Sequence, residues 1–192
     1  MPKAGSPASR THERRAVMTA ITQTVLVHAD IAVRAMGVDA RMQLADEIFQ
    51  QQPNLLASVL VLPSMGITMA QLDPVITILF VAWQAMKTSG HQWALISDEV
   101  QERCLDRLTG RIGFVEGLDV VMQAKATKQH IDEHPEPYLL AFVFGHLGEH
   151  DLVSVKTEAE KYLLLAALNL VDCIAAAVQS KPRPRTTPKR RR

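Results

Sequence analysis

The sequence contains few of the residues that stabilise small cross-linked or metal-clustered folds. Only two of its 192 residues are cysteines, Cys104 and Cys173, which excludes a disulfide framework and a four-thiolate zinc site. Aromatic residues make up only 5% of the chain, so the core must consist mainly of leucine, valine, isoleucine, alanine and methionine. Hydrophobic residues nevertheless reach 47%, which is enough for one domain with a sizeable core.

No apolar run has the character of a secretory signal or a membrane span. The first residues are polar, basic and rich in proline and serine. The two most apolar stretches, 75–86 and 162–178, are interrupted by Gln84 and by Asn169 and Asp172. The first spans only 12 residues, and in the second an aspartate at the centre of a bilayer would cost about 2.5–3.5 kcal/mol, so both stretches are predicted to be buried helices. With two free cysteines, these features predict a cytoplasmic protein without membrane insertion.

Several enzyme motifs are missing from the sequence. There is no G-x-S-x-G nucleophile elbow, no Walker A loop and no G-x-G-x-x-G dinucleotide fingerprint. No Glu-x-x-His pair occurs either, which excludes the ligand pattern of a ferritin-like di-iron bundle. We therefore assign no catalytic residue, and an interaction protein is favoured over an enzyme.

Hydrophobic periodicity predicts an all-α fold in a single domain. Apolar residues recur at helical spacing through residues 13–180, and no alternation of strands with helices is visible. We expect a bundle of about six or seven helices in which residues 74–87 and 162–178 pack centrally. Residues 55–62 are too few for periodicity to distinguish a helix from a strand.

Capping and turn residues predict several helix boundaries. The first helix is expected from about Glu13 onward. Asp73 is expected to cap a helix opened by Pro74, because aspartate favours the N-cap and proline the first turn. Gly110 is expected to weaken or break one helix, and Gly148 to end another.

Asn169 and Asp172 lie one helical turn apart within a very apolar segment. Their spacing continues the polar stripe of Glu158 and Lys161, so both are expected to face water. The alternative is a buried pair of polar partners at a functional centre.

Charge is segregated along the chain. Residues 16–180 carry a net charge of −9, whereas residues 1–15 carry +3 and residues 181–192 carry +7. The two ends, 1–12 and 181–192, have no buried face and are predicted to be a disordered basic arm and a disordered basic tail. The cations of the tail are Lys181, Arg183, Arg185, Lys189, Arg190, Arg191 and Arg192.

A tail of this kind can lie along a phosphate backbone and release its counterions. We therefore predict that the tail engages nucleic acid or an acidic protein surface, with little sequence selectivity because it has no aromatic residue for base stacking. The alternative is a solvated tail that contacts the protein's own acidic body.

The histidines supply a second hypothesis. His146 and His150 lie four residues apart in the string H-L-G-E-H, which resembles the H-x-x-E-H motif of inverzincin metalloproteases. On a helix the two imidazoles would share one face and could hold zinc. The resemblance covers five residues without a β-rich context, so a metal-binding, hydrolytic domain is kept as an alternative. A structural or adaptor subunit, with a possible homo-oligomeric face, is the third hypothesis.

Overall fold

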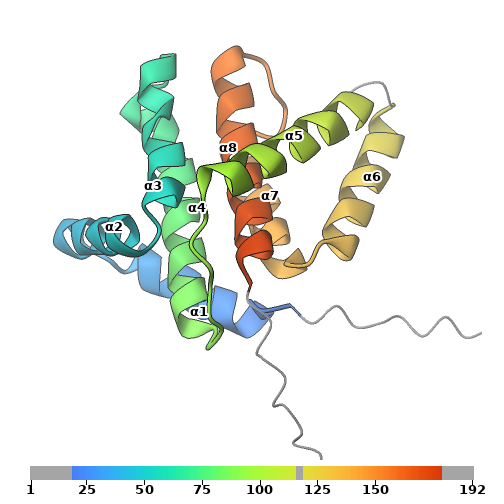
Figure 1. Ribbon diagram of the computed structural model, residues 1–192. Coiled ribbons are helices and arrows are strands. Elements are labelled where there is room, and N and C mark those ends of the chain that lie inside the picture. Colours follow the sequence, from blue (N-terminus) through green and yellow to red (C-terminus); the bar gives the residue numbers. More distant parts are fainter. Residues whose placement is uncertain (1–18, 116–118, 179–192) are drawn as a thin grey trace, which may run out of the picture.

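The computed structural model describes residues 19–115 and 119–178, which form an all-α bundle (Figure 1). The all-α prediction is confirmed. The described residues contain eight α-helices and no strand, rather than six or seven helices, because the ambiguous stretch 55–62 is largely helical. An isolated antiparallel bridge joins Trp93 and Val178.

The helices follow one another with short connections. Their bounds are α1 (Gln23–Arg34), α2 (Val38–Gln51), α3 (Pro53–Leu60), the 3₁₀ helix η1 (Leu62–Met65), α4 (Met69–Thr88), α5 (Asp98–Val115), α6 (Val120–Glu133), α7 (Pro137–Glu149) and α8 (Glu158–Ala177).

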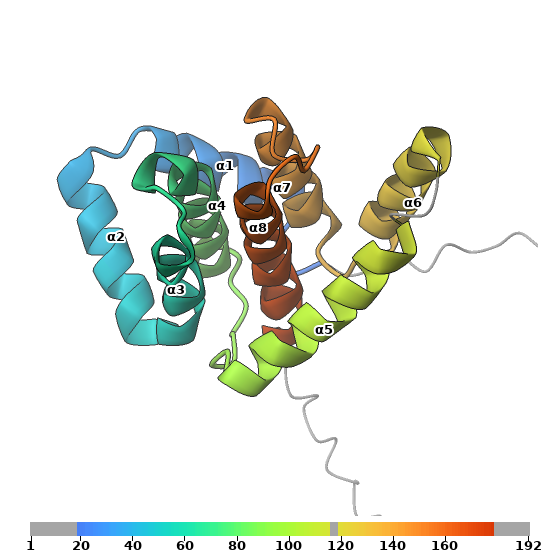
Figure 2. The same cartoon turned by 90° about the horizontal axis from the view of Figure 1, so that it is seen from above.

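Helices α4 and α8 lie at the centre of the bundle, as their apolar sequences predict (Figures 1 and 2). Helix α4 is apolar nearly all round and is packed by α1, α2, α3, α7 and α8. It is long and apolar enough to cross a membrane by length and composition, but 67% of that window is buried inside this fold. The buried side chains of α4 and α8 belong to one continuous hydrophobic core together with those of the surrounding helices.

The start of α4 differs from the prediction. The helix begins at Met69, capped by Thr68, whose hydroxyl accepts from the Gln71 N–H while the Gln71 side chain accepts from the Thr68 N–H. This capping box satisfies two otherwise free amides, so it competes successfully with the signal from Asp73. Pro74 consequently lies inside the helix, in its second turn.

Two glycines expected to interrupt helices lie within them. Helix α5 continues through Gly110, and α7 continues through Gly148 to Glu149. Neither glycine has a positive φ. A glycine costs a helix only about 1 kcal/mol relative to alanine, which packing of the neighbouring residues can exceed.

Helix α1 begins later than predicted. Residues 13–18 lie outside the described part of the chain, residues 19–22 are not helical, and Thr22 caps the helix at Gln23.

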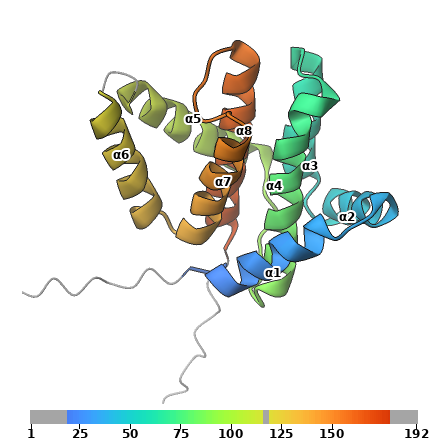
Figure 3. The same cartoon turned by 180° about the vertical axis from the view of Figure 1, so that it is seen from behind.

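Helices α5 and α6 form an open V at one side of the bundle, with α5 against α8 and α6 against α7 (Figures 2 and 3). This V creates the site described next.

Candidate functional site between α5, α6 and α8

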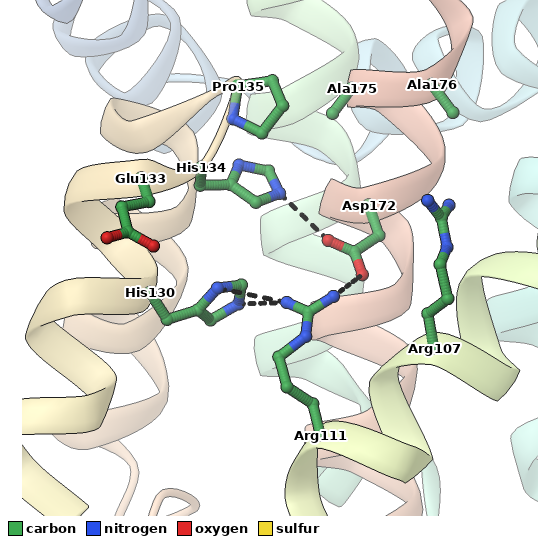
Figure 4. Close-up of a pocket in the computed structure, with 9 residues that line it drawn as sticks. All are labelled: Arg107, Arg111, His130, Glu133, His134, Pro135, Asp172, Ala175 and Ala176. Carbon is green, nitrogen blue, oxygen red and sulfur yellow. Dashed lines mark hydrogen bonds and ion pairs between the residues drawn. The ribbon is translucent and has the colours of Figure 1, made fainter.

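A pocket of about 430 Å³ lies between α5, the end of α6 and the last turns of α8 (Figure 4). Ionisable side chains from three helices converge on it. The lining residues are Arg107, Arg111, His130, Glu133, His134, Pro135, Asp172, Ala175 and Ala176.

Asp172 connects the side chains of this pocket. It is 8% exposed, and its Oδ1 lies 2.9 Å from His134 Nε2 while its Oδ2 lies 3.4 Å from Arg111 Nη2. Burial alone would raise the pKa of Asp172, but the hydrogen bond from His134 and the charge of Arg111 outweigh burial and lower it. The expectation that Asp172 faces water is therefore wrong, because the turn after α6 covers this side of α8.

His134 is held by both of its ring nitrogens. Its Nδ1 accepts the backbone N–H of Glu136 at 3.0 Å, so the proton must reside on Nε2, which donates to Asp172. No ring nitrogen is left for proton exchange with a ligand. His134 therefore ties the turn between α6 and α7 to α8 rather than acting as an acid or base.

Glu136 extends this link to the start of the described chain. Its carboxylate is 1% exposed and accepts hydrogen bonds from the backbone amides of Ala20 and Ile21, both at 2.9 Å, and from the hydroxyl of Thr19. These bonds hold residues 19–21 in a non-helical conformation ahead of α1. One turn thus fixes α8 on one side and the entry to α1 on the other.

His130 is the more accessible imidazole of the pocket. Arg111 Nη1 lies 2.7 Å from His130 Nε2 and 3.1 Å from Nδ1, and the His130 ring meets that of His134 edge-on with centroids 5.6 Å apart. Burial, followed by the positive charge of Arg111, lowers the pKa of His130. Its neutral form therefore predominates at pH 7. Among the described residues, no serine, threonine or cysteine lines this pocket, so the chemistry of its described lining suits binding of a polar ligand more than nucleophilic catalysis.

Three arginines, Arg103, Arg107 and Arg111, recur every four residues along α5, and we call them the arginine row. Residues four apart share one helix face. Arg107 borders both the pocket and a neighbouring hollow of about 540 Å³, which Arg103 also lines. Ala176, in the last turn of α8, borders both spaces as well.

The basic tail follows directly after this end of α8. The helix ends at Ala177, four residues before the tail begins at Lys181. The seven tail cations and the arm 1–12 lie outside the described residues. Near this end of α8, the basic residues whose positions the structure gives are those of the arginine row.

The structure brings His146 and His150 together, with ring centroids 4.9 Å apart at the end of α7. Within residues 19–115 and 119–178, no group of three or more histidine, cysteine or acidic side chains could hold a metal ion. His146 is 7% exposed, and neither ring nitrogen has a hydrogen-bond partner. Glu149 approaches its Nδ1 only to 3.7 Å, so burial dominates and lowers the pKa of His146. The zinc hypothesis therefore has two ligands here and no third.

Sequence reasoning identified part of the pocket. It weighed Asp172 as a buried partner at a functional centre, but it assigned no role there to Arg111 or Glu136. The four-residue spacing of arginines on α5 was the available signal for Arg111.

A comparison of the chain with protein-family models finds no match. Searches of curated proteins and of solved structures also find no significant match.

Proposed function

We propose that the protein is a non-enzymatic helical binding module that engages nucleic acid through its basic tail, assisted by the arginine row of α5. The observation that carries the proposal is the position of Arg107 beside Ala176, in the last turn of the helix from which the tail continues. The row thereby lies at the end of α8 from which the chain continues, in sequence, towards Lys181. Nucleic acid bound to the tail is then in reach of the row.

Charge distribution limits where contact takes place. Residues 16–180 carry a net charge of −9, which opposes wrapping of a polyanion around the body. Within the row, Arg111 is already engaged by Asp172 and His130, and Asp106 lines the same hollow as Arg103. The tail therefore supplies most of the affinity, and Arg103 and Arg107 add to it.

The test is fluorescence anisotropy with a labelled duplex and a labelled single strand at low and physiological salt. The full chain is compared with a full-length variant in which all seven tail cations become glutamine. We expect loss of at least about tenfold in affinity at low salt and a shallower salt dependence, since each released phosphate contact removes about 0.9 from the slope. Unchanged binding by the tail variant, or no binding by the native chain, would overturn the proposal.

A matched pair of variants tests the row separately. The double substitution R103Q/R107Q is expected to weaken binding several-fold, whereas K125Q/K128Q removes the same charge from a different helix, α6, and serves as the control. Equal effects of the two double variants would show that net charge, not the position of the row, determines affinity.

A further inference from the structure

Helix α2 has two apolar faces, and only one of them belongs to the core. Leu44 and Ile48 are buried, whereas Val38, Met42 and Phe49 are 74%, 61% and 65% exposed. Half-buried Ala45 lies between them, at the edge of the exposed face where it also packs against the core, and the four residues follow the spacing 4, 3, 4. We call Val38, Met42, Ala45 and Phe49 the α2 stripe.

This spacing is that of the a and d positions of a coiled coil. Large apolar side chains gathered on one exposed helix face are typical of a surface that another helix covers. Helix α2 forms an outer edge of the bundle, with α3 and α4 on its inner side (Figures 1 and 2). A partner helix can therefore approach the stripe from outside without displacing the core.

We propose that the partner is α2 of a second copy of this chain, and that the two helices pair in parallel about a two-fold axis. A self-complementary stripe is what a two-fold dimer requires, because the same residues meet on both copies. The inference concerns a different surface from the nucleic-acid contact and does not rest on it.

The charges that flank the stripe select this orientation. With Met42 at an a position, Arg41 falls at g and Asp39 and Asp46 fall at e. In a parallel pair, the g residue of one helix faces the e residue five positions later on its partner, so Arg41 meets Asp46 twice, once on each side of the axis. In an antiparallel pair, e faces e, and Asp39 would face Asp46 with the same sign of charge.

The helix is short, so the dimer is expected to be weak. Its 14 residues span about 21 Å, which places only four apolar layers at the interface. Such a contact lies at the low end of interface size, and the expected dissociation constant is in the micromolar range.

The test is sedimentation velocity of the full chain over a concentration series across the micromolar range. We expect a reversible shift from monomer to dimer. The substitution M42E places a charge in the stripe and is expected to weaken self-association at least about tenfold. The control is V121E, which makes the same kind of change at a 77% exposed valine on α6 and should leave the association unchanged.

Charge reversal distinguishes the two orientations. In a parallel dimer, R41D and D46R each weaken self-association, because like charges then face each other across the axis. Mixing the two variants restores dimers, since a chain that is acidic at both positions then faces a chain that is basic at both. In an antiparallel dimer, D46R would instead strengthen association. That result, failure of the mixture to associate, or a native chain that stays monomeric throughout the series would overturn the proposal.

Discussion

The Nε2 atom of His134 donates to Oδ1 of Asp172 across 2.9 Å, linking the turn after α6 to the C-terminal part of α8. Both side chains are buried, and the second nitrogen of His134 is occupied by the Glu136 N–H. The pair therefore holds one wall of the pocket in place, while His130, Arg107 and Arg111 line the space itself. We therefore expect substitutions of this pair to affect stability, and substitutions of Arg107 to affect the binding proposed above.

Removing the carboxylate of Asp172 is expected to destabilise the fold. In D172A, the N–H of His134 and the guanidinium of Arg111 lose their acceptor, which should lower the free energy of unfolding by about 3 kcal/mol. D172N keeps an oxygen that can accept from His134 and should cost only about 1 kcal/mol. Urea unfolding measures both. Equal losses would show that the His134 hydrogen bond contributes little.

Glu136 is expected to control the order of the chain ahead of α1. In E136A, the amides of Ala20 and Ile21 lose their buried acceptor, so both should exchange with solvent much faster. The loss in unfolding free energy should be about 2–4 kcal/mol, because two amides are left without a partner, whereas the Thr19 hydroxyl can still donate to the Ile21 carbonyl at 2.9 Å. Hydrogen exchange followed by NMR resolves the two sites. The comparison is E133A, which removes a carboxylate three residues earlier; unchanged protection in E136A would contradict the clamp.

Acid is expected to weaken the fold from near-neutral pH downward. Burial lowers the pKa values of His130 and His146 below the ordinary 6.5, so the folded protein resists protonation that the unfolded chain accepts. As the pH falls below 6.5, the unfolded chain binds more protons, and the free energy of unfolding declines until the folded pKa values are passed. The pKa of Asp172 is also lowered, and its contribution is lost only further into acid, below 3.8.

The pH dependence can be assigned with H146F, which keeps a flat ring against Phe142 without a titratable group. We expect the variant to lose less stability than the native protein between about pH 8 and about pH 5, as measured by urea unfolding. An identical pH profile would show that His146 contributes no penalty on protonation.

The central helices were predictable because their apolar residues are contiguous in sequence. Helix α4 is apolar over almost its whole length, which favours a position inside the core of a helical bundle. Its first turn was not predictable from Asp73 alone, because two caps compete locally and Thr68 forms the reciprocal one with Gln71. Local signals thus identified the helix but not its start.

The pocket was harder to predict because it depends on contacts between distant residues. Asp172 continues a polar stripe on α8, and only the return of the chain at His134, 38 residues earlier, converts its position from surface to interior. Glu136 similarly gains its role from amides more than 110 residues away. Helical periodicity shows which face a residue occupies but not what will cover that face.

Two glycines offer opposite outcomes for the same substitution. Gly148 lies inside α7 with ordinary backbone angles, and a methyl group there would meet nothing within 4 Å. G148A should therefore stabilise the protein by about 0.5–1 kcal/mol, because alanine loses less backbone entropy in a helix. Gly66 ends η1 with φ at 86°, a left-handed conformation that disfavours alanine, so G66A should destabilise by about 1 kcal/mol even though its methyl group also has free space. Thermal unfolding of the two variants compares the backbone effect alone; a stabilised G66A or a destabilised G148A would contradict this account.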